Sequence, residues 1–195
     1  MPRREIEFQP GSYYHIYNRG VNKGKIYFEH ENYDFFLHRM KEYLQPESVE
    51  VIAFCLMPNH FHLIVCPQTE NFSHNMGLIA MSYAKAVNSR YQRSGPLFQG
   101  RFRAKWIGKD EYLLHLSRYI HVNPVIGKLV EKAEGWEFSS YRDYIGLREV
   151  NYLRPTIVLE QFSMAENDRQ NQLKAYKEFV EEYANEDIER IKHLL

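Results

Sequence analysis

Hydrophobic and polar residues follow two kinds of pattern along the chain. Two-residue alternation and runs of β-branched or aromatic residues predict strands, whereas apolar residues three and four apart predict helices. Strands are expected over residues 11–20, twice within 49–67, and over 96–108; helices are expected over 31–45, 71–95 and 110–125. The resulting order is strand, helix, two strands, helix, strand, helix. It predicts an α+β fold in which helices pack against one antiparallel sheet.

The last part of the chain has a different pattern. Residues 134–144 form an aromatic-rich segment without clear periodicity, and residues 167–195 have the spacing of a late helix. We therefore expect one main domain over residues 1–150 and a C-terminal helical appendage over residues 151–195.

The most apolar run of the chain contains two histidines, His60 and His62, one residue apart. Because strand side chains alternate between faces, the two imidazoles should lie side by side, with Phe61 and Leu63 turned into the core. The pair could be two half-buried histidines satisfied by hydrogen bonds. Burying adjacent imidazoles requires several partners, however, and neutral imidazoles are common metal ligands. Such a pair can share a cation, a proton network or a phosphate.

The third predicted helix carries a polar stripe beside its apolar one. His115, Tyr119 and Asn123 are spaced by four residues and should therefore share one side of the helix. A tyrosine and an amide one turn apart could reach a cation bound by histidines, although a helical tyrosine is more often a packing residue. His121 lies off this stripe, and we expect it to be solvated or structural.

Charge is unevenly distributed, although 25 Lys and Arg residues balance 25 Asp and Glu residues. Residues 71–109 contain seven Lys or Arg residues and no Asp or Glu. This local basic field favours a polyanionic partner. The candidates for nucleic-acid contact are Arg90, Arg93, Arg101, Arg103 and Lys105, with Arg19 and Lys23 as weaker ones. The aromatic residues of the segment could stack on unpaired bases or belong to the core: Phe98, Phe102 and Trp106.

The remaining sequence signals concern the cellular compartment. Cys55 and Cys66 fall within predicted strands and are interpreted as small buried thiols rather than as a secreted disulfide framework. The first residues are too charged for a signal peptide, and no stretch approaches the length of a membrane span. We expect a cytoplasmic protein with no membrane partner.

Four ordered motifs, LMPNHFHLIV, SGPLFQGRFRAKWI, YLLHLSRYIHVNPV and WEFSSYRDYIG, resemble those of the REP-associated tyrosine transposases. These belong to the insertion-sequence-type single-tyrosine HUH transposases, named for two histidines separated by an apolar residue. The resemblance begins at YYHIYNRG and runs to about Leu147. It implies a ferredoxin-like HUH endonuclease fold with a C-terminal helical extension. It also implies cleavage and joining of single-stranded or hairpin DNA, at hairpin-forming repeats, through a 5′-phosphotyrosine.

The same resemblance implies roles for individual residues. Tyr119 matches the nucleophile, His60 and His62 match the metal ligands, and Asn123 matches the third ligand of a bound Mg²⁺ or Mn²⁺. The protein would act as a monomer or a homodimer. Because a residue that precedes proline disfavours helical geometry, we expect the helix to end at Pro124. Two alternatives stay open: a catalytically silent hairpin-binding module, and a metal-dependent phosphodiesterase that uses water.

Overall fold

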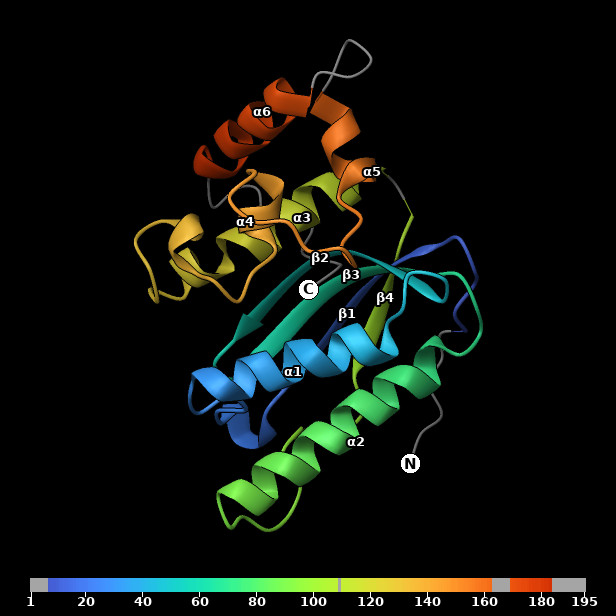
Figure 1. Ribbon diagram of the computed structural model, residues 1–195, viewed down its shortest axis with the longest axis vertical. Coiled ribbons are helices and arrows are strands. Elements are labelled where there is room, and N and C mark those ends of the chain that lie inside the picture. The colour runs from blue at the N-terminus through green and yellow to red at the C-terminus, as the bar shows by residue number, and fades with distance from the viewer. Residues whose placement is uncertain (1–6, 109, 163–168, 184–195) are drawn as a thin grey trace.

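A four-stranded antiparallel sheet forms the centre of the molecule (Figure 1). The computed structural model describes residues 7–108, 110–162 and 169–183. The strands are β1 (Tyr13–Arg19), β2 (Val49–Met57), β3 (His60–Pro67) and β4 (Arg103–Ile107), in the order β2-β3-β1-β4. Pro58 and Asn59 make the tight turn between β2 and β3. Helices pack on this sheet, so the predicted α+β class is confirmed.

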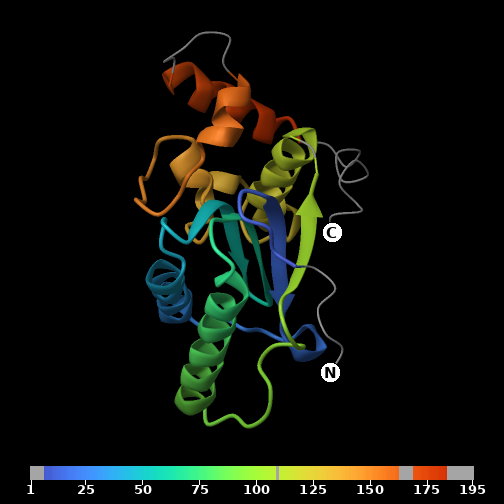
Figure 2. The same ribbon diagram turned by 90° about the vertical axis from the view of Figure 1, so that its right-hand side faces the viewer.

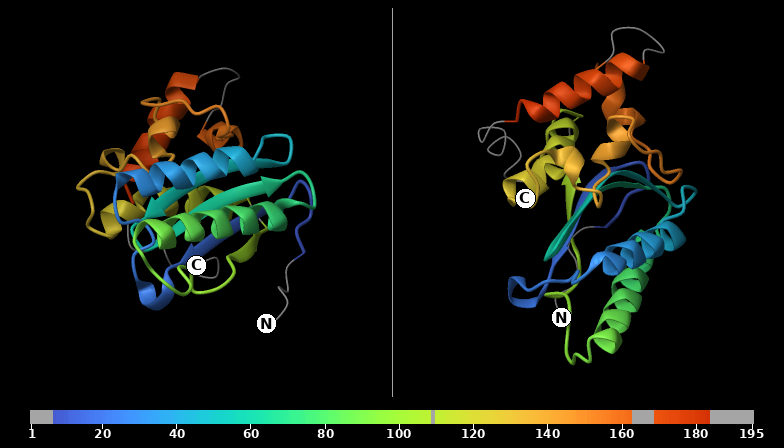
Figure 3. Two further views of the ribbon diagram at one scale, coloured as in Figure 1. Left: turned by 60° about the horizontal axis from the view of Figure 1, so that its bottom comes forward. Right: turned by 60° about the vertical axis from the view of Figure 1, so that its left-hand side comes forward.

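Helices cover both faces of the sheet. α1 (His30–Tyr43) and α2 (Phe72–Arg90) lie side by side on one face, and α3 (Asp110–Ile126) lies on the other, as Figures 2 and 3 show. The connection β1-α1-β2-β3-α2-β4 and the strand order are those of the ferredoxin-like fold.

Strand alternation divides β3 between these two faces. The Phe61 ring lies 5.2 Å from the Phe36 ring of α1, measured between centroids, and both side chains are buried. On the opposite face, the His62 ring lies 5.8 Å from the Tyr119 ring of α3. The prediction that the two histidines and Phe61 face opposite sides is therefore confirmed.

The connection from α2 to β4 differs from its prediction. α2 ends at Arg90, before the predicted end at residue 95, and the chain then turns through left-handed conformations at Gln92 and Gly95. β4 begins only at Arg103, so Arg101 precedes the strand. Two of the three aromatic residues considered for base stacking belong to the core, Phe98 and Phe102, whereas Trp106 is 61% exposed.

The prediction that Pro124 ends the third helix is wrong. α3 continues to Ile126, and the backbone N–H of Gly127 donates to the Asn123 carbonyl at 2.8 Å. A proline inside a helix loses the bond that its own N–H would make. Because Pro124 lies in the last turn of α3, that loss affects little of the helix, and Asn123 keeps its place on the stripe with Tyr119.

The segment after α3 covers the outer edge of β2. The backbone N–H of Leu56 donates to Phe138, and that of Ser140 donates to Phe54, both at 2.9 Å. The region expected to be irregular therefore pairs with the sheet. Its short helices are η2 (Ala133–Gly135) and α4 (Tyr141–Tyr144), followed along the chain by α5 (Thr156–Leu159), η3 (Glu160–Phe162) and α6 (Arg169–Glu181).

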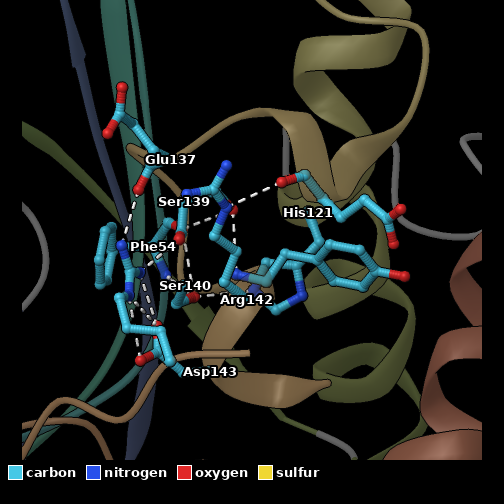
Figure 4. Close-up of polar contacts among 10 residues, drawn as sticks. Phe54, His121, Glu137, Ser139, Ser140, Arg142 and Asp143 are labelled. Atoms are coloured by element: carbon cyan, nitrogen blue, oxygen red, sulfur yellow. Dashed lines mark hydrogen bonds and ion pairs between the residues drawn. The ribbon is translucent and has the colours of Figure 1, made fainter. Parts of the chain in front are cut away.

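A buried polar network joins α6 to α3. The His121 ring is fully buried, with Nε2 2.8 Å from the Ser140 hydroxyl (Figure 4). Its Nδ1 lies 2.7 Å from the Tyr176 hydroxyl of α6. The Tyr176 hydroxyl donates to Ser117 of α3 at 3.1 Å. Burial lowers the pKa of His121 to about 3, so the ring is neutral and structural. The predicted domain division at residue 150 stays a prediction, but α6 shares this core with α3.

Among the described residues, no helix combines the length and the apolar character needed to cross a membrane.

We predict that Tyr176→Phe lowers the free energy of unfolding by about 1–3 kcal/mol, because it leaves the buried Nδ1 of His121 without its partner. Urea denaturation followed by circular dichroism measures the change. Tyr27→Phe is the matched control, since Tyr27 is also buried but its hydroxyl has no hydrogen-bond partner in the described part of the chain. Equal losses in the two variants would contradict the role of the network.

Candidate active site

A cavity of about 370 Å³ lies on the α3 side of the sheet. β3 contributes His60 and His62 to its wall, and α3 contributes Tyr119. The His60 and His62 rings are 5.0 Å apart between centroids and nearly perpendicular to each other. The Tyr119 ring meets His62 edge to face. Three of the residues predicted from the sequence thus share one cavity, with the Tyr119 ring in contact with that of His62.

Asn123 connects the histidine pair to Tyr119. Burial lowers the pKa of His60, and hydrogen bonding with the Asn123 side chain partly offsets this. Burial raises the pKa of Tyr119, and hydrogen bonding with the same Asn123 side chain lowers it. The amide thus influences the protonation of both groups, although Asn123 is not among the residues that line the cavity. His115 does not line the cavity either and packs 5.7 Å from the Phe179 ring of α6.

His62 is held by a residue that the sequence patterns did not identify. Its Nδ1 lies 2.8 Å from Nε2 of His15, and the two rings stack with centroids 5.0 Å apart. Burial, with additional effects from His15 and His60, lowers the pKa of His62 well below its usual value. His62 is consequently neutral at physiological pH. Alternation along β1 could have placed His15 on a sheet face, but only the register of β1 against β3 brings it to His62.

The donor set fits a divalent cation. Two neutral imidazoles and an amide oxygen are acceptable ligands for Mn²⁺ and Mg²⁺ when phosphate oxygens or water complete the coordination. No cluster of three or more His, Cys, Asp or Glu side chains suited to a metal occurs within residues 7–108, 110–162 and 169–183. A cation at His60 and His62 would therefore need a third protein ligand of another kind, such as the Asn123 amide predicted from the sequence.

Basic residues form part of the cavity wall. They include two residues favoured by the sequence, Arg101 and Arg103, and the two weaker candidates, Arg19 and Lys23. The Arg19 guanidinium donates to the Gln99 side chain, which also lines the cavity. These cations give the cavity the charge needed to receive a phosphate backbone.

The other predicted basic residues lie outside the cavity wall. Lys105 stands opposite His15 across the β1–β4 ladder, and burial followed by repulsion from Arg103 lowers its pKa. Arg90 forms an ion pair with Glu29, and the Arg93 guanidinium lies 5.3 Å from the centre of the Phe28 ring. Arg90 and Arg93 are thus held by Glu29 and Phe28 at the C-terminal end of α2.

Comparison with known proteins relates this chain to transposases. The family model described as "Transposase IS200 like" matches residues 9–123. A Haemophilus influenzae protein named as a REP-associated tyrosine transposase is 26% identical over 149 residues, which cover 64% of this chain and 84% of that protein. The solved structure of a REP-associated tyrosine transposase bound to a REP hairpin superposes with a TM-score of 0.63 at 17% identity, covering 79% of this chain and 98% of that one. At this identity the superposition establishes the shared fold.

We predict that His62→Ala lowers the affinity for Mn²⁺ by at least tenfold. Loss of a residue that supports a metal ligand already costs about 10–100-fold, and loss of the ligand should cost no less. Titration of the metal-free protein, followed by electron paramagnetic resonance of free Mn²⁺, measures the affinity. The control is His74→Ala, which removes an exposed histidine of α2. Unchanged Mn²⁺ binding by His62→Ala would exclude His62 as a ligand.

Proposed function

The chain belongs to the IS200-like transposase family, and from this premise we propose that it cuts and rejoins single-stranded DNA beside hairpin-forming repeats. The convergence of Tyr119 with His60 and His62 in one cavity lined by basic side chains carries the proposal. A nucleophile, a candidate metal site and a phosphate-binding surface are the three parts that such chemistry requires. The hairpin in the structure of the transposase described above supports the same class of substrate.

Tyr119 is the proposed nucleophile. Burial raises the pKa of its phenol, so the group is protonated at neutral pH and is a weak nucleophile until its proton leaves. Its Oη attacks the phosphorus of a phosphodiester, and the bond from phosphorus to the 3′ oxygen breaks. The phenolic proton passes to water in the cavity, and the released 3′ oxygen takes a proton from water. The product is a 5′-phosphotyrosine and a 3′-hydroxyl end.

His60, His62 and Asn123 are the proposed ligands of Mg²⁺ or Mn²⁺. When bound, the cation supplies positive charge that polarises the phosphate and stabilises the charge developing on its oxygens. The contribution of the chain is to keep both imidazoles neutral by burial and to hold the amide beside them. Neutral imidazoles retain the nitrogen lone pair that a metal requires.

Joining reverses the cleavage step. A 3′-hydroxyl gives up its proton to water and attacks the phosphotyrosine phosphorus, the bond to Tyr119 Oη breaks, and the phenol recovers a proton from water. One phosphodiester replaces another, so the reaction needs no external energy source. The basic residues Arg19, Lys23, Arg101 and Arg103 would hold the DNA backbone near the cavity during the exchange.

We predict that the wild-type protein forms a covalent adduct with DNA through Tyr119. The substrate is a set of 3′-labelled hairpins with randomised flanking nucleotides, incubated with Mn²⁺ and then denatured. The label should migrate with the protein, and peptide mapping should locate it on Tyr119. Tyr119→Phe should form no adduct, although it removes only one oxygen and should fold.

Tyr17→Phe is the matched control, because Tyr17 also lines the cavity, with its ring 6.1 Å from that of His62. This variant should still form the adduct. An adduct in Tyr119→Phe would identify another nucleophile. Cleavage without any adduct would favour water as the nucleophile, and hairpin binding without cleavage would favour a silent binding module.

We predict that Arg101→Gln with Arg103→Gln weakens hairpin binding and flattens its dependence on salt. Removing one side chain that neutralises a phosphate should reduce the slope of log affinity against log salt by about 0.7–0.9. Arg90→Gln with Arg93→Gln removes the same charge and should have a smaller effect, since those side chains are engaged by Glu29 and Phe28. Fluorescence anisotropy across a salt series distinguishes the pairs. An unchanged slope in the first variant would mean that the DNA binds elsewhere.

A further inference from the structure

Asn59 stands between His60 and the loop that follows β1. Its side-chain Oδ1 lies 2.6 Å from Nδ1 of His60. Its Nδ2 donates to the backbone carbonyl of Lys23 at 3.1 Å. Its own backbone carbonyl accepts a hydrogen bond from the N–H of Gly20 at 2.9 Å. One residue of the β2–β3 turn thus joins a candidate metal ligand to a basic loop of the cavity.

These contacts determine the direction of the hydrogen bond to His60. A backbone carbonyl can only accept, so the NH₂ group of Asn59 must be the side of the amide that faces Lys23. The amide oxygen must then face His60, and it too can only accept. Nδ1 of His60 is therefore the protonated nitrogen. In a neutral imidazole this leaves the lone pair on Nε2.

We propose that Asn59 is a positioning residue that holds His60 in the Nδ1–H tautomer, so that Nε2 is presented to the cation. This role rests on the proposed function of His60 as a metal ligand. Because Nδ1 is engaged by Asn59, Nε2 is the ring nitrogen that remains for a cation.

The contact at His62 does not impose a tautomer in the same way. His62 Nδ1 and His15 Nε2 are both ring nitrogens, and either one can be the donor. Of these two candidate ligands, His60 is the one whose partner, the Asn59 amide oxygen, can only accept a hydrogen bond from the ring. The tautomer of His60 is thus fixed by the protein, independently of any bound ion.

The loop that orients Asn59 is itself closely constrained. Asn22 and Lys23 have positive φ angles of 54° and 58°, which residues other than glycine rarely adopt. Gly20 admits no side chain, because an added Cβ would lie 2.1 Å from the carbonyl oxygen of Gly24. A carbonyl held in such a loop is a fixed acceptor for the Asn59 amide.

The first test measures the tautomer of His60 in the metal-free wild-type protein. Long-range ¹H–¹⁵N correlation spectra distinguish a protonated ring nitrogen from one that carries a lone pair. The signals of His60 are those missing from the spectrum of His60→Gln. We expect Nδ1–H, and a spectrum showing Nε2–H would overturn the proposal whether or not any variant folds.

The second test compares Asn59→Ala with Asn59→Asp. Asn59→Ala should lose the Nδ1–H preference and bind Mn²⁺ about 10–100-fold more weakly. Asn59→Asp keeps an acceptor beside His60 and should retain the tautomer. If Asn59→Ala keeps both the tautomer and the wild-type Mn²⁺ affinity, Asn59 has no positioning role. If the wild type binds no Mn²⁺, the proposed metal function fails first, which distinguishes the two failures.

Discussion

The rest of the site depends on how two neighbouring imidazoles are satisfied, that of His62 buried and that of His60 half-buried. A buried polar group without a partner costs about 1–3 kcal/mol, and His60 and His62 lie next to each other in a covered sheet. The sheet and its β2–β3 turn supply a hydrogen-bond partner for each of the two rings. β1 brings His15 to Nδ1 of His62, and the β2–β3 turn brings Asn59 to Nδ1 of His60. The other nitrogen of each ring is left for a ligand, and this determines where a cation could bind.

The second requirement is a fixed rotation of α3. Residues two positions apart on a helix point to nearly opposite sides, so His121 lies on the side of α3 away from the cavity when Tyr119 lines the cavity. His121 is held by Tyr176 and Ser140, and the guanidinium of Arg118 lies 4.1 Å from the centre of the Phe179 ring. α6 therefore packs against the side of α3 that is opposite to Tyr119 and Asn123. The C-terminal segment contributes to the site without lining it.

Those parts of the site that depend on local periodicity could be predicted from the sequence. Strand alternation predicted the face of His60 and His62, and helical spacing predicted that Tyr119 and Asn123 share a side. His15 and Asn59 could not be assigned, because their roles depend on strand register and on the path of a loop distant in sequence. The expected helix end at Pro124 was wrong for a related reason: the preference of the residue before proline is weak compared with tertiary packing, and Asn123 is buried.

The central claim is that one sheet face and one helix assemble a single metal and nucleophile site within this chain. Anomalous diffraction from crystals soaked in Mn²⁺ tests it most directly, because it locates the ion without reference to activity. We expect one strong peak within bonding distance of ring nitrogens of His60 and His62 and of the Asn123 side-chain oxygen, beside the Tyr119 hydroxyl. A peak that lies elsewhere, or that contacts neither histidine, would contradict the claim.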